Sequence, residues 1–176
     1  NGLAKAIDQD AMIGEDEIFE IENIISGDYA DQLFGTIGDN AITGGLGSDT
    51  ITTYGGKDRI IYETAEDAGD IITDFSSADD VMAVSQLITS TATSLSFGDL
   101  ISLEANGSDT IVKMSPNGDG NFTLSIATLK NVSPSELSAS NFDLDGGSLP
   151  KSSVTGSAST LITEKAFDGT GIFDDD

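Results

Sequence analysis

Residues 43–60 read TGGLGSDTITTYGGKDRI, and this stretch decides the fold. Its glycines crowd around Asp49 and Asp58 and argue against a regular helix, because glycine is a weak helix former. Ile51 and Ile60 lie nine residues apart, and so do the two aspartates. A chain that places a carboxylate and an apolar residue on one nine-residue period is expected to repeat its local structure with that period.

The same period extends to both sides of this stretch. Counted from Gly44, four blocks in phase span residues 26–34, 35–43, 44–52 and 53–61. The sixth position of each block is acidic or an amide, and the eighth is aliphatic. These residues are Asp31, Asn40, Asp49 and Asp58 at the sixth position and Leu33, Ile42, Ile51 and Ile60 at the eighth. The alternative is a loop rich in Gly and Asp between strands, but agreement at two separate positions favours a repeat.

Each block predicts a six-residue turn followed by a very short strand, with alternate blocks on opposite sides of a parallel coil. Glycine tolerates positive φ, so the turn can aim its carbonyl groups at one point. The sixth-position side chain adds an oxygen there, and the eighth-position side chain points into the core. Two turns on the same side of the coil would then enclose one calcium ion, because calcium prefers carboxylate and carbonyl oxygens.

The blocks resemble the calcium-binding β-roll of the RTX (repeats-in-toxin) family, which is built from nonapeptide repeats. The resemblance covers roughly residues 24–62, and block 44–52 fits at every position. It implies an all-β fold, with a short parallel β-roll of nonapeptide repeats followed by a β-rich C-terminal capping region. The departures are Tyr29 for a turn glycine, Asn40 for the acid, and Thr53 and Tyr54 for the leading glycine pair. A site that uses the neutral Asn40 is expected to bind calcium more weakly.

The resemblance also implies which residues hold Ca²⁺. Within the repeats they are Gly27, Asp31, Gly35, Gly38, Asn40, Gly44, Gly45, Gly47, Asp49, Gly56 and Asp58. Further acids follow the last block. Asp67 and Asp70 either form a capping calcium site beside the roll or belong to a solvated acidic face, and the sequence leaves both interpretations open.

The composition restricts the partners and the chemistry of this 176-residue chain. It has 31 acidic and 7 basic residues, for a formal net charge of −24. We therefore expect no nucleic acid as a partner, because phosphate contacts need Lys and Arg. The chain has no His and no Cys, which removes the usual zinc ligands and every mechanism that needs a catalytic histidine, so no enzyme activity is expected. No apolar run reaches about 18 residues, so we expect no direct membrane insertion.

Residues 63–145 extend the resemblance. DAGDIITDFSSADDVMAVSQLI (67–88) and GSDTIVKMSPNGDGNFTLSIATLKNV (107–132) are similar to the C-terminal targeting region of type I secreted proteins, as found in large RTX adhesins. This implies the type I secretion machinery as a partner during export from a Gram-negative bacterium, and an extracellular or cell-surface location. The alternating residues on both sides of PNGDGN predict a β-hairpin. Asn117, Asp119 and Asn121 form either its turn or a calcium loop.

These observations divide the chain into five parts. They are an N-terminal capping segment (1–23), the calcium-binding roll (24–62), the β-rich cap and secretion region (63–145), a flexible linker (146–160), and an acidic tail or exchangeable strand (161–176). Because the sequence starts at Asn1 without Met, we expect a longer parent protein. Two functions fit: a calcium-binding module that folds on export, or a subunit of a self-assembling extracellular fibre, biofilm matrix or surface layer, with self-association through the tail.

Overall fold

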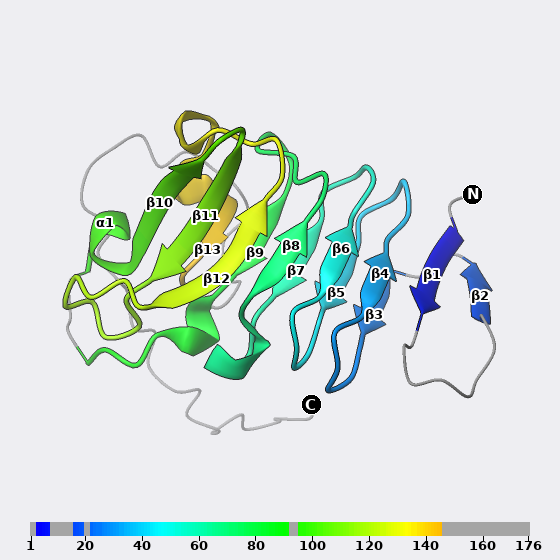
Figure 1. Ribbon diagram of the computed structural model, residues 1–176, viewed down its shortest axis with the longest axis horizontal. Coiled ribbons are helices and arrows are strands. Elements are labelled where there is room, and N and C mark those ends of the chain that lie inside the picture. Colours follow the sequence, from blue (N-terminus) through cyan, green and yellow to red (C-terminus); the bar gives the residue numbers. More distant parts are fainter. Residues whose placement is uncertain (1–2, 8–15, 20–21, 92–94, 146–176) are drawn as a thin grey trace, which may run out of the picture.

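The computed structural model describes residues 3–7, 16–19, 22–91 and 95–145. Strands dominate these residues (Figure 1), and the single α-helix among them, α1 (Phe97–Leu100), has only 4 residues. The expectation of an all-β fold is therefore confirmed. None of the described helices has the length and hydrophobicity needed to cross a bilayer. The linker and the tail predicted from residue 146 onward lie outside the described residues.

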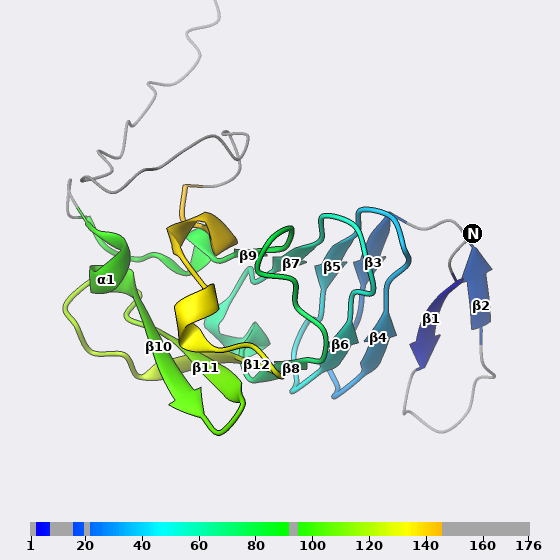
Figure 2. The ribbon, with the colours of Figure 1, turned by 90° about the horizontal axis from the view of Figure 1, so that it is seen from above.

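The repeats wind into a parallel coil with two facing sheets (Figure 2). One sheet contains β3 (Asn23–Ile25), β5 (Ala41–Thr43), β7 (Arg59–Ile61) and β9 (Val81–Ala83). The other contains β4 (Gln32–Phe34), β6 (Thr50–Thr52) and β8 (Asp70–Ile72). The chain alternates between the sheets at every strand, and strands within each set pair in parallel. This is the β-roll that the nine-residue period predicts.

The eighth-position side chains form the core of the roll. Ile42 pairs with Ile24 and Ile60, while Ile51 pairs with Leu33 and Ile72, so the inward residues stack along the coil. Ile42, Ile51 and Ile60 are fully buried. Side chains alternate between the two faces of a strand, so the middle residue of each three-residue strand points inward and its neighbours point outward. The predicted inward orientation of the eighth-position side chains is confirmed.

The coil continues past residue 62, where the nine-residue period ends. β8 pairs with β6 and β9 with β7 in the same parallel manner. Ile72 and Met82 continue the two stacks of inward residues and are fully buried. The connections before β8 and β9 span residues 62–69 and 73–80, and each is longer than the six-residue turns before it. These longer connections hide the last two strands from a search at fixed spacing.

Antiparallel strands extend the sheet of β4 at the N-terminal end. β1 (Leu3–Ile7) pairs with β4, and β2 (Asp16–Phe19) pairs with β1. The sheet of β3 has no such addition among the described residues, so β3 is its outer strand there. The two sheets of the roll thus end differently on this side.

The C-terminal region continues both sheets of the roll. β10 (Ile101–Asn106), β11 (Asp109–Met114) and β12 (Leu124–Leu129) form an antiparallel meander, and β12 adds in parallel to β8. β13 (Phe142–Asp143) adds in parallel to β9. Short 3₁₀ turns connect these parts: η1 (Ala65–Asp67), η2 (Ser85–Leu87), η3 (Pro134–Glu136) and η4 (Ala139–Asn141). The roll and this region share one hydrophobic core.

Candidate metal centre

The turns of the roll lie in two rows at opposite edges of the coil (Figure 1). We call the connections that lead from the sheet of β3 to the sheet of β4 the first turn row; they span residues 26–31, 44–49 and 62–69. The connections that lead back form the second turn row and span residues 35–40, 53–58 and 73–80. Because consecutive turns along the chain alternate between the rows, neighbours within a row come from successive coils.

Sixth-position side chains connect neighbouring turns of each row. In the first row, Asp31 N donates to Asp49 Oδ1 at 2.8 Å, and Asp49 N donates to Asp70 Oδ1 at 2.9 Å. The second row repeats this pattern. There Asn40 N donates to Asp58 Oδ1 at 2.8 Å, and Asp58 N donates to Asp80 Oδ1 at 3.0 Å. One carboxylate oxygen of each aspartate therefore holds the turn before it in place.

The second oxygen of Asp49 and of Asp58 has no such role. Both Oδ2 atoms are buried and have no hydrogen-bond partner among the described residues. An ionised oxygen buried in this way is unfavourable unless something compensates its charge. A cation bound inside the turn supplies that compensation, so the donor chemistry of both turns fits a hard metal ion.

The pKa values of these carboxyl groups give the same indication. Burial, as the largest cause, raises the pKa of Asp49 to about 6, and the nearby Asp31 and Asp67 add to the effect. Burial likewise raises the pKa of Asp58 to about 7, with contributions from Asp80 and Asp39. Without a cation, the turns hold their carboxylates in an environment that disfavours the charge.

Glycines leave the space that this arrangement needs. A Cβ atom on Gly44 would lie 2.3 Å from Asp49 Oδ2, and one on Gly45 would lie 2.2 Å from the carbonyl oxygen of Gly27. Gly47 and Gly56 have φ of 123° and 120°, a left-handed region that other residues rarely enter. These four predicted positions therefore require glycine on steric or conformational grounds.

The other predicted glycines differ in how much space surrounds them. A Cβ on Gly35 would lie 2.6 Å from Asn40 Oδ1, so that position is also confined. Gly27 has no atom within 4 Å of such a Cβ, and at Gly38 the nearest lies at 3.6 Å. The structure gives Gly27 a backbone role instead, because its carbonyl oxygen accepts a hydrogen bond from Leu46 N at 3.0 Å.

Acidic side chains alone do not complete a metal site. Within the described ranges, no three acidic side chains come close enough together to hold an ion by themselves. A cation in these turns would therefore need one or two carboxylates together with backbone carbonyls. That is the ligand set that the glycine-rich turn pattern predicts.

Asp31 and Asn40, at the N-terminal end of each row, hold their own turns. Asn40 Oδ1 accepts a hydrogen bond from Thr36 N at 2.6 Å, and Asp31 Oδ2 accepts one from Ser26 Oγ. Both side chains are buried. Each of these residues therefore donates its backbone N–H to the next coil while its side chain closes the turn in which it lies.

Asp67 and Asp70 have different roles in the structure. The Asp67 carboxylate accepts hydrogen bonds from Glu63 N and Thr64 N, both at 2.8 Å, and from Thr64 Oγ1 at 2.7 Å. It thereby caps η1. Asp70 takes the sixth-position role through its bond from Asp49 N, and burial raises its pKa to about 7. The structure therefore does not give the two residues a common set of contacts.

Sequence reasoning missed Asp74 and Asp80. Asp80 occupies the sixth-position role in the last turn of the second row. The sequence pattern that could have identified Asp80 is the spacing shared by the repeats, in which an aspartate stands two residues before a buried apolar residue. Here that apolar residue is Met82. Asp74 accepts hydrogen bonds from Thr53 N at 2.8 Å and Tyr54 N at 2.9 Å, and so supports the turn that lacks the leading glycine pair. Tyr54 there has a φ of 66°.

The loop between β11 and β12 is held by hydrogen bonds of its own. Asp119 accepts them from Asn121 N at 2.9 Å, Ser115 Oγ at 2.9 Å and Asn117 Nδ2 at 2.8 Å. These donors, the Asn121 backbone first, lower the pKa of Asp119 to about 2. The contacts describe a closed hairpin turn around one carboxylate.

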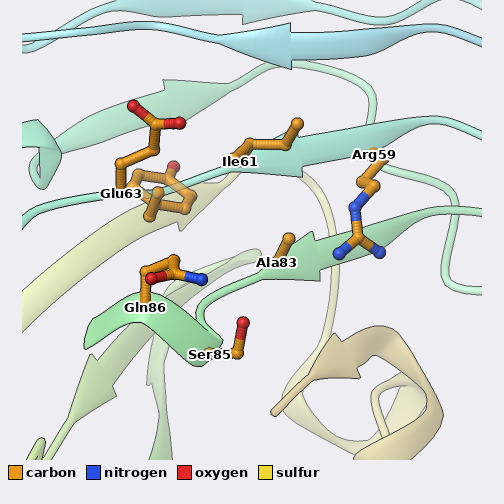
Figure 3. A pocket seen from close by; sticks show the side chains of 7 residues that line it. Arg59, Ile61, Glu63, Ala83, Ser85 and Gln86 are labelled. Atoms are coloured by element: carbon orange, nitrogen blue, oxygen red, sulfur yellow. The ribbon is translucent and has the colours of Figure 1, made fainter. Parts of the chain in front are cut away.

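A separate hollow of about 260 Å³ lies beside β7, β9 and η2 (Figure 3). Its lining includes Arg59, Glu63 and Gln86. The Arg59 guanidinium forms an ion pair with Asp143, which links β7 to β13. The hollow meets the first turn row only through Tyr62 and Glu63, so it is distinct from the space beside Asp49 and Asp58.

No family model and no curated protein sequence matches this chain. Solved structures with similarity include two subunits of the Azotobacter vinelandii mannuronan C5-epimerase. The solution structure of the AlgE6R3 subunit has 22% identity and a TM-score of 0.43, with 89% of this chain and 93% of that chain covered. For the AlgE6R2 subunit, the identity is 22%, the TM-score 0.49, and the coverage 70% of this chain and 92% of that chain. Similarity at this level does not identify a family, and the β-roll rests on this chain's own strand pairing.

Proposed function

We propose that this chain is a calcium-binding β-roll module that folds when it meets Ca²⁺ outside the cell. The observation that carries the proposal is the pair of buried, unpartnered oxygens, Asp49 Oδ2 and Asp58 Oδ2, each inside a glycine-rich turn. The turns offer only oxygen donors, and the chain has no His or Cys to favour zinc. Calcium suits flexible sites of carboxylates and carbonyls, whereas Mg²⁺ demands octahedral geometry and keeps its water.

The net charge explains why folding would depend on the ion. At −24 the folded chain repels itself, and the roll brings several of its carboxylates together within its turns. A ligand that binds only the folded state stabilises that state in proportion to the logarithm of its concentration. Cytosolic calcium is far below extracellular calcium, so the same chain would stay open inside the cell and fold outside it.

The region after the roll is proposed to cap it and to direct export. β12 and β13 continue the two sheets and close the C-terminal end of the core. The similarity of residues 63–145 to the targeting region of type I secreted proteins supports the type I secretion machinery of a Gram-negative bacterium as the export partner. We propose an adhesin-like parent protein at the cell surface or in the medium, and no enzyme activity, nucleic acid partner or membrane insertion for this module.

A calcium titration followed by far-UV circular dichroism tests the proposal. We expect little ordered structure in excess chelator, a cooperative gain of β signal with calcium, and a much weaker response to magnesium at equal concentration. The double variant Asp49→Asn with Asp58→Asn is the matched control, because it removes both unpartnered carboxylates and keeps the side-chain size. A wild-type spectrum that is fully folded in chelator would contradict the proposal.

A second candidate function is a self-assembling extracellular structural subunit. The observation that favours it is β3, which is the outer strand of its sheet among the described residues and carries Ile25 with 80% of its surface exposed. An uncovered strand edge with an exposed aliphatic side chain is a template for pairing with another chain. Light scattering in calcium distinguishes the functions: assembly that Ile25→Lys abolishes supports the subunit, and a monomeric wild-type chain excludes it.

A further inference from the structure

Tyr62 occupies a glycine position of the first turn row. It stands eighteen residues after Gly44, at the first residue of the next turn in that row. The backbone supports this alignment, because Ser26 and Tyr62, the first residues of turns 26–31 and 62–69, make equivalent hydrogen bonds. Ser26 N donates to Thr43 O, and Tyr62 N donates to Ala83 O. In both cases the acceptor is the last residue of the next strand in the sheet. Gly44 leaves space for Asp49 Oδ2, whereas the residue at the equivalent position of the next turn, Tyr62, carries an aromatic side chain.

The ring of Tyr62 is buried and its hydroxyl lies among carboxylates. Only 1% of the residue is exposed. The Asp70 carboxylate interacts with its hydroxyl, although the pair lacks the geometry of a full hydrogen bond. Burial, and then the adjacent Asp70 carboxylate, raise the pKa of the phenol well above 10, with smaller contributions from Asp49 and Asp67. The group is therefore a neutral O–H donor in a place that gathers negative charge.

The rest of this turn differs from the two turns before it. Residues 62–69 include the 3₁₀ turn η1, and the Asp67 carboxylate is engaged by donors of its own turn. Asp70 Oδ1 already holds Asp49 N. The second turn row ends in a similar way, because Asp80 Oδ2 accepts a hydrogen bond from Ser76 N at 2.8 Å within the last turn.

We propose that Tyr62 ends the first row of cation sites. Turns 26–31 and 44–49 enclose an ion, whereas between turns 44–49 and 62–69 the buried side chain of Tyr62 takes the place of an ion, with its hydroxyl beside the Asp70 carboxylate. The ring takes up the space and the hydroxyl supplies the polar contact, so no ion is needed at this boundary between roll and cap. The inference rests on the proposed calcium-binding function and adds a positioning residue to it.

Two substitutions separate the hydroxyl from the ring. Tyr62→Phe keeps the ring and removes only the donor, and Tyr62→Gly restores the residue found at Gly44. Tyr29→Phe is the matched control, because it removes a hydroxyl from a mostly exposed tyrosine of the same row. For each chain, calcium bound per molecule is measured by equilibrium dialysis with atomic emission, and the calcium midpoint of folding by circular dichroism.

We expect Tyr62→Phe to bind as many ions as the wild type but to need about three- to tenfold more calcium to fold, because the polar contact between its hydroxyl and the buried Asp70 carboxylate is lost. Tyr62→Gly is expected to bind one additional ion, and Tyr29→Phe to match the wild type. A Tyr62→Phe midpoint equal to that of the control overturns the inference, and so does a folded Tyr62→Gly chain with no additional ion. If Tyr62→Gly does not fold, Tyr62→Phe decides alone. A wild-type chain that binds no calcium overturns the proposed function itself.

Discussion

Asp49 and Asp58 each divide their two carboxylate oxygens between two tasks. Oδ1 accepts the backbone N–H of the preceding turn, and Oδ2 stays buried and available for a cation. An asparagine could perform the first task but not the second, because its amide is neutral. At Asn40 the side-chain Oδ1 instead accepts a hydrogen bond from Thr36 N in its own turn. An aspartate at the sixth position therefore both connects neighbouring coils and supplies a charge that can bind a cation.

Substitutions of Asp49 should separate these two tasks. Asp49→Asn keeps an acceptor for Asp31 N and removes the charge, so we expect weaker calcium binding, on the order of tenfold, with the folded spectrum retained at high calcium. Asp49→Ala also removes the acceptor, and should lower stability by about a further 1 kcal/mol. Isothermal titration gives the affinities, and urea unfolding in saturating calcium gives the stabilities. Equal behaviour of the two variants would show that Oδ1 contributes nothing.

The strands of the roll are only three residues long, so each contributes one side chain to the core. No such strand is stable alone, and each depends on the strands stacked on both sides of it. Ile51, for example, lies between Leu33 and Ile72 in the core. The energetic unit of the roll is therefore the stack of inward side chains rather than the single strand.

Truncation of one inward side chain should reveal this dependence. Ile51→Ala leaves a cavity in the middle of a stack, and we expect a loss of about 2–5 kcal/mol in the free energy of unfolding in calcium. The neighbouring Thr50→Ala is the control, because Thr50 points outward and is half-buried. Urea denaturation at saturating calcium measures both. A similar loss for the two variants would argue against the inward assignment of Ile51.

The roll up to residue 62 could be predicted because its turns all have the same length, so Asp49 and Ile51 recur as Asp58 and Ile60. β8 and β9 keep the same pair as Asp70 with Ile72 and Asp80 with Met82. The longer connections before them shift the spacing, so the period no longer locates them. The parallel additions of β12 and β13 join segments far apart in the chain, and no local pattern contains that information.

In the candidate site, the sixth-position acids and the crowded glycines lie in turns between short strands, as the sequence predicts. It could not show which oxygen of each carboxylate is already engaged, because that depends on the coil stacked on the turn. The sequence left Asp67 open between a capping calcium site and a solvated acidic face, and the structure shows its carboxylate accepting hydrogen bonds from Glu63 and Thr64 at the start of η1. Tyr62 lies where the nine-residue period ends, and only its burial beside Asp70 indicates a role.

The whole molecule has one hydrophobic core that runs from the roll into the C-terminal strands. The chain has a formal net charge of −24, and several of its aspartates are buried in the turn rows that flank this core. Arg59 is one of the few basic residues, and its ion pair with Asp143 links the roll to β13. The stability of the molecule is therefore set by apolar burial against a large electrostatic opposition.

This opposition predicts how the calcium-free chain responds to pH. Burial raises the pKa of Asp49 to about 6 and the pKa values of Asp58 and Asp70 to about 7. In the unfolded chain, aspartate has a pKa of about 3.9. Between these values the folded state holds more protons than the unfolded state, so its stability falls as the pH rises from about 4 to about 7. We expect more β structure without calcium at pH 5 than at pH 7.5.

Circular dichroism in chelator at the two pH values checks this expectation. Asp58→Asn is the control, because it removes one of the three raised carboxyl groups and should reduce the difference between the two spectra. In calcium the trend should reverse, since ion binding requires deprotonated ligands and becomes tighter as the pH rises. A calcium-free chain that is more ordered at pH 7.5 than at pH 5 would contradict the electrostatic account.

The alternation of the chain between two sheets also restricts how the roll can change in length. Ile42 stacks on Ile60 in one sheet, while Leu33 stacks on Ile51 in the other, so a complete coil comprises two blocks. Deletion of a single block would send every later strand to the opposite sheet and would separate β8 and β9 from β12 and β13. Deletion or duplication of two blocks would restore every pairing. The roll can therefore shorten or grow only in even numbers of repeats, a counting rule that any insertion or deletion in this region has to obey.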